Sequence, residues 1–180
     1  MKLKNIRNLI IIFITALNNA SAIKNEKDDY TLYANEIIHS FAKQIKKEFG
    51  FNCEASGGSM PYDVEEISIK FSTNRQVSID EARELEVKIT EKLVEFINAH
   101  EKIRPFLREY PFPANRADVM IRFYKTKNFN LSNNNVELVF QAKNKIFYQA
   151  KKLNNPHLYD TLKEEPYEEA LKIVQNKTTP

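Results

Sequence analysis

The chain is predicted to fold as one α+β domain, with two long helices packed on one face of a mainly antiparallel sheet of about five strands. Two long segments repeat apolar residues at helical spacing, and several short segments alternate apolar with polar residues as half-buried strands do. Most of these strands follow one another without an intervening helix, which favours antiparallel pairing. The expected order is α-β-β-α-β-β-β-α.

Residues 1–22 are expected to be a secretory signal peptide, because a basic start, an apolar core and small residues follow in that order. The apolar core, residues 9–17, is about half the length of a membrane span, which needs roughly 20 residues. No cysteine stands at the cleavage site, so a lipoprotein anchor is not indicated. The features are Lys2, Lys4 and Arg7, then residues 9–17, then Ala20-Ser21-Ala22, with cleavage expected after Ala22.

Removal of this leader changes the charge balance of the protein. The whole chain has 27 basic and 24 acidic residues, and three basic and no acidic ones lie within residues 1–22. The remaining domain, residues 23–180, therefore carries about no net charge. Nucleic-acid binders usually show a basic excess, so a nucleic-acid partner is not expected. Secretion or residence in the periplasm is the expected location, with no stable membrane anchor after cleavage.

The composition also limits metal and disulfide chemistry. Cys53 is the single cysteine, so an intramolecular disulfide and a cysteine-based metal cluster are excluded. The three histidines are widely spaced in sequence and form no local metal-binding motif. No cofactor and no metal are expected, and the oligomeric state is left open.

The first helix and the first two strands are predicted from residue spacing. Apolar residues recur about every four positions over residues 30–49, and Gly50 stands where a left-handed cap belongs. Alternation predicts a short strand over residues 51–55 and a longer one over residues 64–73. The segment Ser-Gly-Gly-Ser, residues 56–59, is expected to form the turn between them.

The remaining elements follow the same rules. Ser78 and Glu81 have the spacing of a capping box before an apolar helical stripe that runs to about residue 99. A strand is predicted over residues 117–125, an Asn-rich loop over 128–135, and a hairpin around residues 142–145. A last helix is expected near residues 167–175, directly after Pro166.

Two surfaces are candidate binding sites. The scarcity of glycine makes Gly57 and Gly58 notable, and with Ser59 they could form an anion or peptide nest or simply a turn that needs positive φ. Residues 103–113 mix aromatics, arginines and prolines, a composition found in binding interfaces and equally in rigid connections that plug a core. The binding candidates in this segment are Arg104, Arg108, Tyr110 and Phe112.

The catalytic candidates are weaker. Cys53 could act as a nucleophile with a histidine, but its strand pattern predicts a small buried side chain on the face of Phe51 and Ala55. Among the carboxylates, Asp63, Glu65 and Glu66 could supply a pair for acid–base chemistry or could form a solvated face.

Four short motifs resemble a family of uncharacterised secreted proteins from bacteria that live inside host cells. They are SGGSM, SIDEARELEV, IRPFLREYPF and VMIRF, and they extend from about Gly57 to Phe123. The resemblance implies an exported bacterial protein and carries over no catalytic residue. The sequence therefore favours a non-enzymatic domain that binds a protein or peptide. The alternatives are a small hydrolase that uses Cys53, and a periplasmic chaperone-like or envelope-associated protein.

Overall fold

The computed structural model describes residues 26–124, 135–152 and 154–178. The predicted signal peptide, residues 1–22, and the predicted Asn-rich loop except for Asn135 lie outside these described residues. Within the described part of the chain, no helix is both long enough and apolar enough to cross a membrane.

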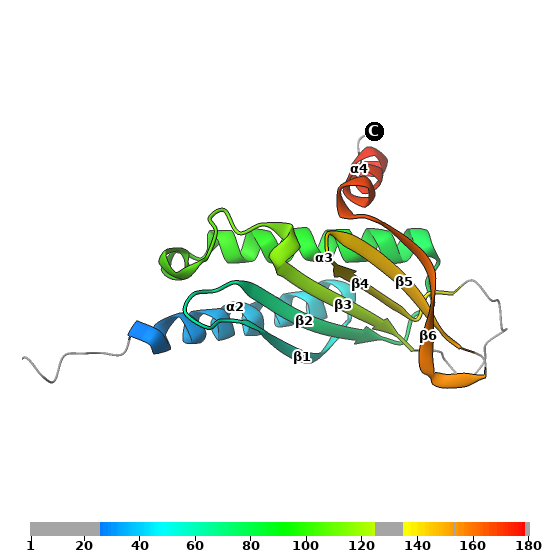
Figure 1. Ribbon diagram of the computed structural model, residues 1–180, viewed down its shortest axis with the longest axis horizontal. Helices are drawn as coiled ribbons and strands as arrows, with labels where there is room; N and C mark the ends of the chain where they lie inside the picture. Colours follow the sequence, from blue (N-terminus) through cyan, green and yellow to red (C-terminus); the bar gives the residue numbers. More distant parts are fainter. Residues whose placement is uncertain (1–25, 125–134, 153, 179–180) are drawn as a thin grey trace, which may run out of the picture.

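The described chain has an α+β fold built on one six-stranded mixed sheet (Figure 1). The sheet order follows the chain order, so β1 and β6 are the two edge strands. The strands are β1 (Asn52–Ser59), β2 (Glu66–Thr73), β3 (Ala117–Phe123), β4 (Leu138–Ala142), β5 (Lys145–Lys152) and β6 (Asn155–Pro166). The helices are α2 (Glu26–Phe49), α3 (Ile79–Ala99) and α4 (Tyr167–Thr178), with the short 3-10 helices η1 (Glu101–Phe106) and η2 (Ala114–Arg116).

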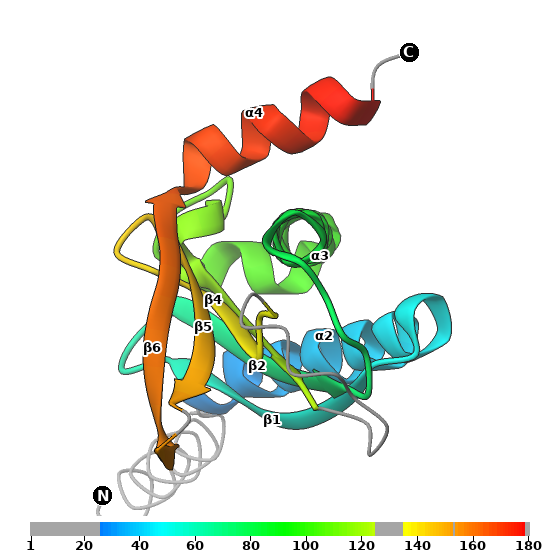
Figure 2. The ribbon, with the colours of Figure 1, turned by 90° about the vertical axis from the view of Figure 1, so that its right-hand side faces the viewer.

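The helices α2 and α3 lie on the same face of the sheet, as predicted (Figure 2). Their sequences place apolar residues on one side, and these residues meet the apolar faces of β2 and β3. The buried ring of Phe41 in α2 joins the helices to the sheet. Its centroid lies 6.2 Å from that of Phe71 in β2 and 5.5 Å from that of Phe96 in α3, both edge-on.

The predicted helix and hairpin signals are confirmed. Gly50 follows α2 with φ of 75°, and its N–H donates to the Lys46 carbonyl at 3.1 Å. Ser78 caps α3 through a complete capping box with Glu81. The β4–β5 hairpin turns through two residues of positive φ, Lys143 and Asn144.

The sheet is mainly antiparallel, as predicted, but it differs from the prediction in two details. It has six strands rather than five, and one pair, β2 with β3, is parallel. The parallel pair arises because α3 crosses over between the two strands, and a crossover helix returns the chain in the same direction. The strand β6 was missed because two register shifts in its pairing with β5 disturb the simple alternation.

The predicted turn at residues 56–59 is also wrong. These residues continue β1, which pairs with β2 as far as Ser59 opposite Glu66. The chain reverses instead over residues 60–65. A register shift between Cys53 and Ala55 interrupts the alternation of β1, so residues two apart across this bulge do not share a face.

Candidate functional site

The loop at residues 103–113 lies against the chain reversal that follows the Gly57–Ser59 candidate surface. The reversal at residues 60–65 and the loop at residues 103–113 are joined by backbone hydrogen bonds on both sides of Val64. The Val64 N–H donates to the Phe106 carbonyl at 2.7 Å, and the Arg108 N–H donates to the Val64 carbonyl at 3.1 Å. We refer to residues 60–65 together with 103–113 as the hairpin–loop surface.

Arg108 holds the two segments of this surface together through ion pairs. Its guanidinium forms ion pairs with Asp63, at 2.9 Å, and with Glu65. Glu65 also accepts a hydrogen bond of 2.6 Å from the hydroxyl of Ser59. Two of the three carboxylates considered for acid–base work are thus partners of an arginine. Arg108 and Ser59 act here as internal supports of the surface, although both keep partial exposure.

Arg104 and Tyr110 are both exposed on the hairpin–loop surface, and they contact each other. The Arg104 guanidinium carbon lies 5.4 Å from the centre of the Tyr110 ring, which is a cation–π contact. The Arg104 Nε atom donates to the Asn98 carbonyl at 3.2 Å, and Tyr110 remains 54% exposed. The pair therefore presents a charged group and an aromatic ring to solvent in a fixed relative position.

Phe112 has a different role, because its side chain is only 1% exposed. Its backbone is held on both sides by the side chain of Asn98, which accepts from the Phe112 N–H at 2.7 Å and donates to the Phe112 carbonyl at 3.0 Å. Phe112 is thus a core plug that anchors the loop. The loop therefore has a buried anchor at Phe112 and an exposed pair at Arg104 and Tyr110.

Gly57 and Gly58 form neither a nest nor a turn, because they lie in the extended strand β1 and neither has positive φ. A Cβ atom at Gly58 would overlap the Glu66 backbone oxygen, so the close approach of β2 requires glycine there. A Cβ atom at Gly57 would meet nothing within 4 Å. Packing inside the described protein therefore explains Gly58 but not Gly57.

Cys53 is exposed rather than buried, contrary to the prediction from its strand pattern. The bulge at residue 54 explains the error, because it removes the simple alternation between Cys53 and Ala55. Partial burial still raises the pKa of the thiol above its ordinary value, although a contact of 3.7 Å from Sγ to the Ala55 carbonyl acts in the opposite direction. A raised pKa disfavours the thiolate that nucleophilic catalysis needs.

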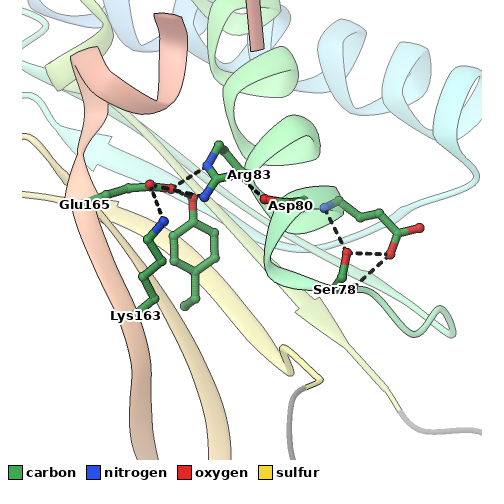
Figure 3. A network of polar contacts seen from close by, with 7 residues as sticks. Ser78, Asp80, Arg83, Lys163 and Glu165 are labelled. Atoms are coloured by element: carbon green, nitrogen blue, oxygen red, sulfur yellow. Dashed lines mark hydrogen bonds and ion pairs between the residues drawn. The ribbon is translucent and has the colours of Figure 1, made fainter. Parts of the chain in front are cut away.

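A buried polar network between α3 and the β6 edge of the sheet was not predicted (Figure 3). Arg83 of α3 donates from Nε to Glu165 of β6 at 2.6 Å, and the Tyr148 hydroxyl of β5 donates to the same carboxylate at 2.5 Å. Burial alone would raise the pKa of Glu165, but the hydrogen bonds outweigh it and lower the pKa below its ordinary value. The other members are Asp80, paired with Arg83, and Lys163, paired with Glu165 at 2.8 Å.

Two cavities accompany these elements. One, of about 520 Å³, lies beside the N-terminus of α3 and is lined by Arg83 and Lys163, whose charges are already paired with Asp80 and Glu165. The other, of about 300 Å³, lies between α2 and α3 and is lined by both apolar and polar residues. Its His100 is 3.8 Å from the carboxylate of Glu36. Within the described ranges, no cluster of His, Cys, Asp or Glu could hold a metal ion.

The chain was compared with protein-family models, with curated proteins and with solved structures, and none of the three comparisons gave a match.

Proposed function

We propose that this is an exported bacterial protein whose α+β domain binds a protein or peptide and catalyses no reaction. The observation that carries the binding proposal is the exposed Arg104–Tyr110 pair, held on a loop that Phe112 and Asn98 anchor to the core. Arginine and aromatic residues supply much of the binding energy in interfaces when they are held rigidly. The hydrolase alternative is less well supported, because the pKa of Cys53 is raised.

The binding proposal is tested by selecting ligands from a random-peptide display library and measuring their Kd by fluorescence anisotropy. In the double variant Arg104→Ala and Tyr110→Ala, the Kd of the selected peptides should rise at least tenfold, since each hot-spot residue contributes more than about 1 kcal/mol. The matched control is Lys172→Ala with Leu158→Ala, which also removes one exposed cation and one large exposed side chain. Equal Kd values in both double variants would refute a role for this surface.

The export proposal rests on the leader at residues 1–22 and on the resemblance of residues 57–123 to secreted proteins. Expression of the full chain in a bacterium, followed by fractionation and intact-mass measurement, tests it. The exported form should begin at Ile23. A full-length chain that stays in the cytoplasm would contradict the proposal.

A further inference from the structure

The two edges of the sheet differ in how they are protected. Natural sheets protect exposed edges with charges and irregularities, because the unpaired backbone groups of an edge strand can pair with another chain. The strand β6 has both protections, since it carries Asp160, Lys163 and Glu164 and two register shifts interrupt its pairing. The strand β1 has one bulge and a single charged residue, Glu54.

The charge of Glu54 is already used within the protein. Its carboxylate accepts a hydrogen bond of 2.9 Å from the Tyr124 hydroxyl and lies 3.9 Å from the Arg122 guanidinium. From Asn52 to Gly58, β1 is exposed along its whole length. Among the described residues, the backbone of β1 is therefore unpaired on the side away from β2, and β1 has fewer charged side chains than β6 to oppose an incoming strand.

Lys70 supplies a positive charge next to this edge. It lies opposite Ala55 in the β1–β2 pair, on the face of the sheet away from the helices, because its neighbours Ile69 and Phe71 are buried under them. Among the described residues Lys70 has no ion-pair partner. Because Ala55 is small, the long side chain of Lys70 can reach over it toward a strand added beside β1.

Gly57 lies on the same face, two residues from Ala55 and opposite Ser68. Nothing inside the described protein requires glycine at this position. A glycine inside a strand often marks the close approach of another backbone, and an aromatic side chain on a neighbouring strand commonly covers an edge glycine.

We propose that β1 binds an extended peptide by strand addition, with an acidic side chain of the peptide near Lys70 and an aromatic side chain over Gly57. This inference goes beyond the proposed function, because it adds a peptide-binding edge at β1 to the surface that carries the Arg104–Tyr110 pair. The size of the edge favours a peptide over a second copy of the chain. The eight residues of β1 fall well short of the 20–30 residues per partner in a standard interface, whereas a peptide can pair along its whole length with such an edge.

The probe is the fluorescein-labelled peptide Ser-Thr-Glu-Thr-Phe-Thr-Glu-Ser, whose two glutamates flank the phenylalanine in either strand direction. Its Kd for the purified protein is compared with that of a peptide carrying lysine in place of both glutamates. The glutamate peptide should bind about two- to fivefold more tightly, the range expected for one exposed ion pair. Lys70→Glu should reverse this order, and the control Lys172→Glu, an exposed lysine of α4, should leave it unchanged.

Two further measurements test the pairing itself. Alternate N-methylation of the peptide, at odd residues in one version and at even residues in another, should abolish binding in one version only, because alternate N–H groups face the protein. Hydrogen exchange should show new protection along β1. If both N-methylated versions still bind, or if the glutamate peptide does not bind at all, strand addition is overturned. Protection of the hairpin–loop surface, residues 60–65 and 103–113, without protection of β1 would overturn strand addition but leave the proposed binding function standing.

Discussion

Arg83 and Glu165 form a buried ion pair that ties α3 to the edge strand β6 across 82 residues of sequence. The two side chains are only 5% and 4% exposed, and their atoms Nε and Oε1 lie 2.6 Å apart. Tyr148 and Lys163 complete the hydrogen bonding of the carboxylate. The pair thus holds the far edge of the sheet against the helix layer.

Arg83→Met should destabilise the fold by about 3–5 kcal/mol, because it leaves the Glu165 carboxylate buried without its main partner. The double variant Arg83→Met with Glu165→Met should recover part of this loss, since no isolated charge then remains. Urea denaturation measures the free energy of unfolding of each variant. The control is Lys145→Met, which breaks an exposed ion pair of 2.7 Å with Glu164 and should cost less than about 1 kcal/mol. Equal losses for the two single variants would show that burial does not matter here.

The burial of the Arg83–Glu165 pair could not be predicted from the sequence, although the helix that carries Arg83 could. The apolar stripe of α3 and its capping box predict the helix correctly, because local spacing encodes both. The same helix buries Arg83, Glu86 and Thr90 on a flank of that stripe, and polar residues in such positions are normally interpreted as facing solvent. The buried partner of Arg83 is Glu165 of β6, and β6 was not predicted. Burial of a charge depends on distant partners that local patterns do not contain.

The candidate surfaces were predicted in the same uneven way. The composition of residues 103–113 correctly marked an unusual loop. It did not show that Phe112 is buried and Tyr110 exposed, because this depends on which residue meets Asn98 and the core. The glycine pair was correctly singled out and wrongly assigned to a turn. Glycine is required at position 58 because the Glu66 carbonyl oxygen lies where a Cβ atom would stand. Residue spacing does not reveal such a close approach between strands.

Glu86 should make the protein less stable as pH rises. The residue is fully buried, and neither carboxyl oxygen has a hydrogen-bond partner of ordinary geometry among the described residues. Burial, with a smaller effect of Asp118, raises the pKa well above its ordinary value. The folded state therefore holds a proton that the unfolded chain releases above about pH 4.3, so this stability is complete below that pH and is lost as pH rises toward the folded pKa.

Glu86→Gln removes this titration while it keeps the shape of the side chain. The free energy of unfolding of the variant, relative to the natural chain, should therefore increase between pH 5 and pH 7, by up to about 1.4 kcal/mol per pH unit. Urea denaturation at several pH values measures the difference. Glu84→Gln is the control, because Lys88 lowers the pKa of Glu84 and its carboxylate stays ionised over this range. If the free energies of unfolding of Glu86→Gln and of the natural chain changed in parallel with pH, Glu86 would not be a neutral buried acid.

The two glycines of β1 should respond differently to the same substitution. Gly58→Ala places a Cβ atom against the Glu66 carbonyl oxygen and should cost about 1–3 kcal/mol, as overpacking usually does. Gly57→Ala adds a methyl group in open space without a strained φ and should change stability by less than about 1 kcal/mol, toward greater stability. Thermal and urea denaturation of both variants provide the comparison, in which each serves as the control for the other. Equal destabilisation would mean that β1 approaches β2 less closely at Gly58 than this structure has it.

Cys53 should react with thiol reagents in the native protein, but slowly at neutral pH. Its exposure gives reagents access, whereas partial burial raises the pKa and keeps the thiol protonated. The rate of alkylation by iodoacetamide depends on the thiolate, so the rate should increase with pH to a midpoint above that of free cysteine, which is about 8.5. Rates measured by mass spectrometry at several pH values, for native and urea-unfolded protein, separate access from ionisation. A midpoint below pH 7 in the native protein would indicate an activated thiolate and would favour the hydrolase over the binding protein.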